Sequence, residues 1–362
     1  MSVQPAETGT SPAERVSTKV DGVDVLGALS PSRAGDFMTC PLLYRFRTID
    51  RLPEPSSPDA MRGTVVHKVL EDLFDLPAAD RTPDRADAMV ELAWHALVEA
   101  SPEIAAMFGD EGPSVGRWLT SCRRSLERYF SLEDPRLLEP AEREVYIESL
   151  LDSKLLLRGF VDRVDVAPDG AIRIVDYKTG NSPSEGFEGK HLFQLKFYAL
   201  VIWRTRGVLP RMLQLVYLGN AEILRYQPDE HDLLATERKI EALWRAIQEA
   251  ETTGDWQPRK SRLCGWCAHT SLCPAWGGTP PPLAERLGGV SETVALGPDR
   301  SLGSVADTDS RKGRREVSLD GALADGQPAG DEPVGEPLFH QPEHLGLAPR
   351  ELDLGRSHPV TE

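Results

Sequence analysis

The sequence lacks any long hydrophobic run. Its apolar stretches are far shorter than the roughly 20 residues that span a bilayer, and residues 1–20 show no basic segment followed by an apolar one. The 362 residues also contain no G-x-x-x-x-G-K-[ST] loop, which excludes an ATP-driven motor of that class. We therefore expect a cytoplasmic chain without a membrane segment, whose 40% hydrophobic content is sufficient for a large core.

Aromatic residues are almost absent from the last quarter of the chain. Residues 277–362 contain one aromatic side chain, Phe339, and 23 Gly or Pro residues. Such a segment cannot bury enough apolar surface to offset the entropy lost on ordering. We predict a disordered acidic tail over 277–362 and a shorter flexible segment over 1–26, which leaves one folded domain at 27–276.

Net positive charge is also lacking. The formal net charge is −16, of which −7 belongs to residues 277–362. Phosphate backbones attract clustered Lys and Arg, so this total at first argues against a nucleic-acid partner. Basic residues are nevertheless clustered at 44–51, 122–128 and 258–262. A local basic groove is therefore compatible with the acidic total.

The order of the patterned segments predicts an α/β fold. Ser30 followed by Pro31 is typical of a helix start, and helical spacing recurs at 61–74, 84–100 and 113–131. Three strand-like runs follow, and after them a helix, two more strands and a long helix. We predict a mixed sheet flanked by helices in one domain, with a helical insertion.

Two of the predicted strands place acids opposite each other. Residues 168–170 (Pro-Asp-Gly) form a turn, so residues whose numbers add up to 338 face each other and Asp162 pairs with Asp176. Two carboxylates about 5 Å apart on an apolar face repel each other. A divalent cation such as magnesium or manganese would relieve that repulsion. The alternative is a structural ion pair of Asp162 with Arg163 or Lys178.

Four further side chains belong with these acids. Lys178 lies one alternation beyond Asp176, where it can hold a water or a developing anion. His67 is a candidate ligand on a helix, with Glu71 as its i+4 neighbour; taken alone, such a histidine is a hydrogen-bonded residue at the edge of the core. Gln194 and Tyr198 are also i, i+4 neighbours, and the simple interpretation is a polar helix edge with a packed ring.

The segments "RGTVVH", "GFVDRVD", "IVDYKTG" and "QLKFY", in this order, resemble the RecB-like nucleases of the PD-(D/E)XK superfamily, the branch that includes the Cas4-type nucleases. The resemblance covers most of residues 27–276. It implies a restriction-endonuclease-like αβββαβ core and a metal-dependent exonuclease that hydrolyses DNA, single-stranded or at its ends, in repair or recombination. The alternative is a non-cleaving DNA-binding module or adaptor that works with a separate helicase.

The resemblance also implies roles for individual residues. The metal ligands would be His67, Asp162, Asp176 and the carbonyl of Tyr177. Lys178 would position the attacking water, with Gln194 and Tyr198 beside the active site in contact with DNA. Glu71 has no family role and is expected to support the ligands from outside.

Cysteines are few, and four of the five form a pattern. Cys264, Cys267 and Cys273 have C-x2-C-x5-C spacing, and Cys40 lies 224 residues upstream; Cys40 and Cys273 each precede a proline. Cysteine–proline pairs occur at iron–sulfur ligands. In RecB-like nucleases, one cysteine near the N-terminus and three near the C-terminus hold a [4Fe-4S] cluster. Zinc is the alternative. We expect Cys122 in the core and His269, inside the cysteine loop, at the surface.

Overall fold

The computed structural model describes residues 19–20, 22–108, 112–184 and 189–283. The predicted tail from residue 284 onwards and residues 1–18 of the predicted flexible segment lie outside these ranges. The strands are β1 (Lys19–Val20), β2 (Val23–Asp24), β3 (Gly27–Leu29), β4 (Glu142–Leu150), β5 (Leu155–Val166), β6 (Ile172–Lys178), β7 (Met212–Tyr217) and β8 (Glu222–Tyr226). The α-helices are α1 (Pro31–Thr39), α2 (Pro41–Tyr44), α3 (Pro58–Leu73), α4 (Pro83–Ala100), α5 (Glu103–Ala106), α6 (Gly112–Leu132), α7 (Gly189–Arg206) and α8 (Glu230–Thr253).

A six-stranded mixed sheet forms the centre of the fold, as the sequence predicts. Strands β3, β5, β6, β7 and β8 are neighbours in that order, and β4 pairs with β5. The β5–β6 and β7–β8 pairs are antiparallel, whereas β3–β5 and β6–β7 are parallel. The three-residue strand β3 was not predicted, because so short a segment shows no alternation.

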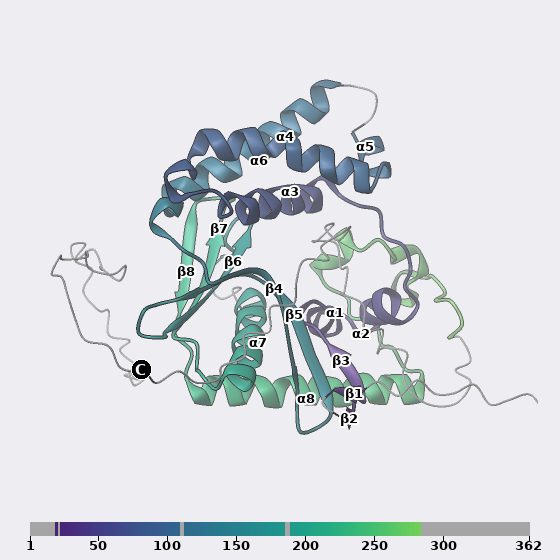
Figure 1. The fold of residues 1–362 in the computed structure, drawn as a ribbon. Helices are drawn as coiled ribbons and strands as arrows, with labels where there is room; N and C mark the ends of the chain where they lie inside the picture. Colours follow the sequence, from purple (N-terminus) through teal and green to yellow (C-terminus); the bar gives the residue numbers. More distant parts are fainter. Residues whose placement is uncertain (1–18, 21, 109–111, 185–188, 284–362) are drawn as a thin grey trace, which may run out of the picture. The chain divides into compact units, whose positions relative to one another are not determined.

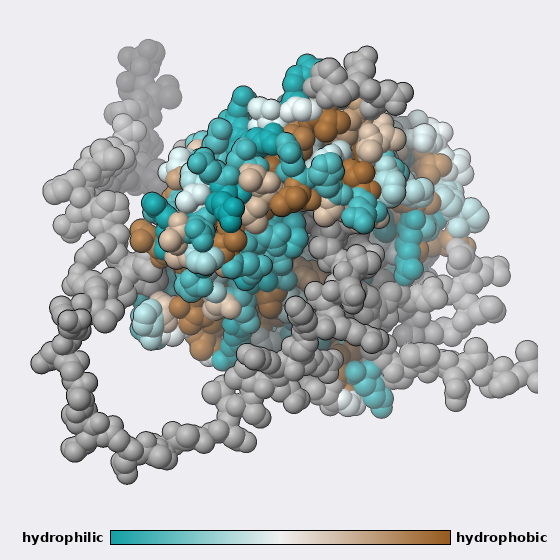
Figure 2. Space-filling model, turned by 45° about the horizontal axis from the view of Figure 1, so that its top comes forward, coloured by the Kyte–Doolittle hydropathy of each residue, from teal (hydrophilic) through white to brown (hydrophobic). Residues whose placement is uncertain are grey.

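Helices cover both faces of this sheet (Figure 1). One core packs α7 and α8 against the face that carries Ile172 and Ile174 of β6. The other packs α3, α4 and α6 against the face that carries Val175 and Tyr177. Residues of β6 thus alternate between two cores, which fixes the face of each side chain. The surface over α4 and α6 mixes hydrophilic and hydrophobic residues (Figure 2).

The predicted hairpin has the predicted register. Val164 pairs with Ile174 and Val166 with Ile172, and pairing ends at Arg163 and Val175. Beyond this point the edge of β5 is taken by β3, which pairs with Leu155–Leu157, while β6 continues beside β7. The two strands therefore separate directly before Asp162 and Asp176.

Helix caps fix the segments on either side of the sheet. Ser30 caps α1 through the backbone amide of Arg33, and Ser57 caps α3 through that of Ala60, each followed by a proline at the first helical position. Cys40 is extended between α1 and α2, because the residue before Pro41 is disfavoured in a helix. Among the described residues no helix is both long and apolar enough to cross a bilayer.

Candidate active site

The fork between β5 and β6 opens into a cavity of about 730 Å³. Six of the side chains predicted for the site line it: His67, Asp162, Asp176, Lys178, Gln194 and Tyr198. The seventh residue, Tyr177, directs its side chain into the core below α3. Its backbone carbonyl lies 3.1 Å from Nε2 of His67. The structure thus brings together every residue that the sequence placed in the site.

Asp162 of β5 and His67 of α3 lie side by side at the fork. The helix α3 brings Nδ1 of His67 to 3.6 Å from Oδ2 of Asp162. The same carboxylate oxygen accepts a hydrogen bond of 2.7 Å from the backbone amide of Tyr177. This bond ties the two strands together where their regular pairing has ended. The alternative predicted from the sequence, an ion pair of Asp162 with Arg163 or Lys178, is not what the described residues show; Asp162 pairs with His67.

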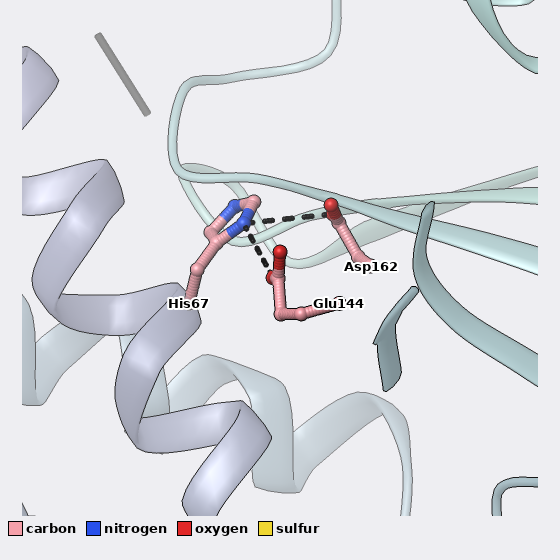
Figure 3. A group of neighbouring side chains, drawn as sticks. All are labelled: His67, Glu144 and Asp162. Carbon is pink, nitrogen blue, oxygen red and sulfur yellow. Dashed lines mark ion pairs between the residues drawn. The ribbon is translucent and has the colours of Figure 1, made fainter. Parts of the chain in front are cut away.

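Glu144 of β4 is a third acid in the site, and the sequence analysis missed it. Its carboxylate lies 3.7 Å from Nδ1 of His67, and one ligand atom each of His67, Glu144 and Asp162 lie within 4.8 Å of one another (Figure 3). Glu71, the expected neighbour, pairs instead with Lys68 at 3.1 Å.

The backbone of Glu144 is strained. It has a φ of 43°, and the β4–β5 register passes from Arg143 to Val145 without it. A left-handed conformation costs a non-glycine residue on the order of 1–3 kcal/mol, and such residues cluster at functional sites. The flanking pairs, Arg143 with Arg163 and Val145 with Val161, place Glu144 opposite Asp162, so the two carboxylates share one face beside His67.

Lys178 and Gln194 complete the far side of the cavity. Nζ of Lys178 lies 2.6 Å from Oδ2 of Asp176 and donates a 3.0 Å hydrogen bond to Oε1 of Gln194. The amide nitrogen of Gln194 donates to Oδ1 of Asp176 at 2.9 Å and to the hydroxyl of Tyr198 at 3.0 Å. Gln194 therefore holds both the carboxylate of Asp176 and the ammonium of Lys178. Tyr198 follows it by four residues on α7, so the two side chains share one face of the helix.

Protonation of the site is unusual without a cation. Burial lowers the pKa of His67, but the carboxylates of Asp162 and Glu144 outweigh burial and raise the pKa to about 9. Burial raises the pKa of Asp162 to about 7, against the opposing charge of His67. Bound protons thus offset part of the negative charge of these acids, as a cation would. Carboxylate oxygens and an imidazole are ligands that manganese or magnesium accepts, so the donor set fits such an ion.

The four patterned cysteines lie around a second, smaller cavity. Cys40, Cys264, Cys267 and Cys273 all line it, and the Cys40 sulfur accepts a hydrogen bond of 3.3 Å from the amide of Arg259. Cys40 is far from the other three cysteines in the sequence, so it is the fold that brings all four to one cavity. Cys122 is buried, as predicted.

His269 corrects a prediction. It was expected at the surface, but it is 4% exposed and its Nε2 lies 2.7 Å from Oε1 of Glu54. The ring also packs edge-on against Phe46. Since a partner 215 residues away decides its burial, the local sequence around His269 carried no signal for it.

Comparison with known proteins gives one family match over most of the chain. The family model of the PD-(D/E)XK nuclease superfamily matches residues 28–274. The chain is 26% identical over 278 residues to the Gene 69 protein of Mycobacterium phage D29, covering 68% of this chain and 96% of that protein. It is also 26% identical over 252 residues to an ATP-dependent helicase/deoxyribonuclease subunit of Streptococcus mutans, covering 66% of this chain but 21% of that much longer protein.

A solved structure is similar over most of its length. The crystal structure of a putative exonuclease from Eubacterium rectale aligns with a TM-score of 0.45 at 14% sequence identity, over 71% of this chain and 91% of that one.

Proposed function

Because this chain belongs to the PD-(D/E)XK nuclease superfamily, we propose that it hydrolyses DNA phosphodiester bonds with a divalent cation held in the fork between β5 and β6. The observation that carries the proposal is the convergence of Asp162, Asp176, Lys178 and His67 on one cavity. Asp162, Asp176, His67 and the carbonyl of Tyr177 would hold the ion, and Glu144 is a further candidate ligand. We propose residues 27–276 as the nuclease domain.

A bound magnesium or manganese ion would supply an activated water and neutralise charge on the phosphate. The protein's own groups do the rest. The ammonium of Lys178 stands at the cavity wall, where it can orient a water and stabilise the phosphate as negative charge builds. Gln194 holds Lys178 and Asp176 in place, and its amide is held in turn by a hydrogen bond to the hydroxyl of Tyr198. These contacts fix the reacting geometry before substrate arrives.

We further propose an exonuclease that acts on single-stranded DNA or DNA ends in the cytoplasm, in repair or recombination. The named activity of the Streptococcus mutans relative supports work beside a separate helicase. That same relative keeps the alternative open, in which the chain is a non-cleaving DNA-binding or adaptor subunit of a helicase–nuclease complex.

The test is a cleavage assay with end-labelled single strands, with manganese or magnesium. Wild-type protein should release nucleotides, and Asp176→Asn or Lys178→Met should reduce the rate by at least about 1000-fold, because each removes a group that acts in the transition state. Asp169→Asn, at the exposed turn between β5 and β6, and Arg238→Met, at an exposed position of α8, are the matched controls. Tight binding without cleavage in any divalent ion would favour the adaptor.

At the cysteines we propose a [4Fe-4S] cluster with a structural role, joining the segment after α1 to the segment after α8. Two features support thiolates there. The sulfur of Cys40 accepts a hydrogen bond from the backbone amide of Arg259 at 3.3 Å, and that of Cys264 accepts one from the amide of Ser261 at 3.4 Å. The Ser261 amide lowers the pKa of the Cys264 thiol. Purified protein should be brown, with about four irons per chain. The Cys267→Ser variant should lose the iron and the Cys122→Ala variant should keep it. One zinc ion per chain, without iron, would contradict the cluster and favour a zinc site.

A further inference from the structure

The cysteine loop carries exposed apolar side chains outside the cavity in the fork; Leu263 and Trp276 also line the cavity of the cysteines, whereas Trp266 does not. Among the described residues, Trp266 is the most exposed large hydrophobic side chain, at 80%. Trp276 is 57% exposed and Leu263 is 53% exposed, within the same short segment. Single exposed apolar residues are ordinary, but two open indoles so close in the chain are a costly arrangement for a surface that stays in water. We call Leu263, Trp266 and Trp276 the aromatic surface.

Charge identifies what this surface can bind. Residues 256–276 contain Arg259, Lys260 and Arg262 and no Asp or Glu, in a chain whose net charge is −16. The ammonium of Lys260 lies 4.7 Å from the centre of the Trp276 ring, so cation and indole form one unit. A polyanion with flat apolar groups matches this pattern. Unpaired bases stack on indoles while their phosphates pair with Lys and Arg, which is how sequence-tolerant binding of single strands works.

The aromatic surface is tied to the wall of the catalytic cavity. His269, in the same loop, contacts Glu54 at 2.7 Å. Arg47 donates to both carboxylate oxygens of Glu54 at 2.8 Å and to Asp36 at 2.6 Å. Asp36, Arg47 and Glu54 all line the cavity in the fork. The loop and the cavity are therefore joined by a continuous set of charged contacts, and Arg33 and Lys190 add positive charge along the same cavity.

We propose that Trp266 and Trp276, with Lys260 and Arg262, form a binding platform for single-stranded nucleic acid outside the catalytic cavity. This inference rests on the proposed function, since it gives the platform the task of holding the strand whose end is cut. Duplex DNA is not a ligand of the indoles, because its bases are already stacked on each other. The platform therefore distinguishes single strands from duplexes but does not distinguish one base sequence from another.

The test is binding of the full chain to fluorescein-labelled oligothymidylate of about 20 nucleotides, and to its duplex, by anisotropy without added divalent cation. Trp266→Ala should weaken single-strand binding at least about fivefold, the lower end of the range for one stacked base, and leave duplex binding unchanged. Trp266→Phe should restore most of the affinity, because a ring still stacks. Arg262→Gln should reduce the slope of log affinity against log salt by about one.

Matched controls come from exposed residues elsewhere. Leu92→Ala on α4, where the side chain is 69% exposed, and Arg245→Gln on α8 should change neither affinity. Circular dichroism should show that Trp266→Ala is folded. Equal single-strand binding by Trp266→Ala and wild type would overturn the proposal and assign the surface to a protein partner, and an equal loss of single-strand and duplex binding would also overturn it. Failure of the nuclease proposal would look different, because the wild type would then bind strands and cut none with manganese.

Discussion

Uptake of a divalent cation should expel protons from the site, and the number of protons follows from the structure. With a pKa of about 9, His67 is about 99% protonated at pH 7, and Asp162, with a pKa of about 7, is about half protonated. A ligating imidazole must be neutral and a ligating carboxylate ionised. Binding at pH 7 should therefore release between one and two protons. At pH 9 the number should fall to about one half, because most of these protons have already left.

The same values set the pH dependence of affinity. Removing the His67 proton at pH 7 costs about 3 kcal/mol relative to a pH well above 9, from the two-unit difference between pKa and pH. Manganese affinity should thus rise about tenfold per pH unit between pH 7 and 8.5. The sign follows from the raised pKa of a base, whose proton competes with the cation at low pH and is absent at high pH.

Calorimetric titration with manganese, in buffers that differ in ionisation enthalpy, measures both quantities. His67→Gln should bind more weakly, release about one proton fewer at pH 7 and lose most of the pH dependence. His95→Gln, on the exposed face of α4, is the control and should behave as wild type. An affinity that stays constant from pH 7 to pH 9, with no proton released by the wild type, would refute the assignment of His67 and Asp162 to a cation site.

Three further substitutions test the cavity in the fork and the buried ion pair of Arg163. Gln194→Met keeps the side-chain length but removes hydrogen bonds to two charged groups, so the cleavage rate should fall about 10- to 100-fold while manganese affinity changes little, as calorimetry would show. Arg163→Met removes the buried ion pair of Arg163 with Glu133, at 2.8 Å, and should lower the free energy of unfolding by about 3–5 kcal/mol in urea, whereas Arg136→Ala, in an exposed pair, should leave it nearly unchanged. Gly159→Ala would bring a Cβ to 2.7 Å from the Tyr198 ring, so it should cost about 1–3 kcal/mol in thermal unfolding and reduce cleavage.

Contradictory results are equally specific. An unchanged cleavage rate in Gln194→Met would show that Asp176 and Lys178 need no help from α7. Equal stability of Arg163→Met and wild type would mean that the Glu133 carboxylate finds other partners below the sheet. Wild-type cleavage by Gly159→Ala would show that Tyr198 can move without consequence.

The sequence predicts the fork between β5 and β6 because its turn and its alternation are local signals. The Pro-Asp-Gly turn sets the β5–β6 register, and the register places Asp162 and Asp176 at equivalent positions on one face. The position of His67 depended on the family motif, because nothing in α3 alone indicates that it faces the fork. Its contact with the Tyr177 carbonyl spans 110 residues.

Glu144 is the site residue that was not predicted from the sequence. The β4–β5 register follows from the loop after Leu150, and extending it would have placed Glu144 opposite Asp162. Nothing in the sequence of β4 marks Glu144 apart from its other acids, Glu142 and Glu148, and its positive φ is visible in the structure alone. The ion pair between Asp176 and Lys178 was not predicted either. Their positions are about 7 Å apart along a strand, and the lysine side chain is long enough to bring its ammonium to 2.6 Å from the carboxylate.

The central claim is that a cation is held in the fork by Asp162, Asp176 and His67. Its most direct test is a crystal grown or soaked with manganese, with diffraction data collected at the manganese absorption edge. We expect an anomalous peak about 2.2 Å from a carboxylate oxygen of Asp162 and of Asp176 and from a ring nitrogen of His67, and loss of that peak in Asp162→Asn. Density for manganese elsewhere, with these side chains still hydrogen-bonded to one another, would contradict the account.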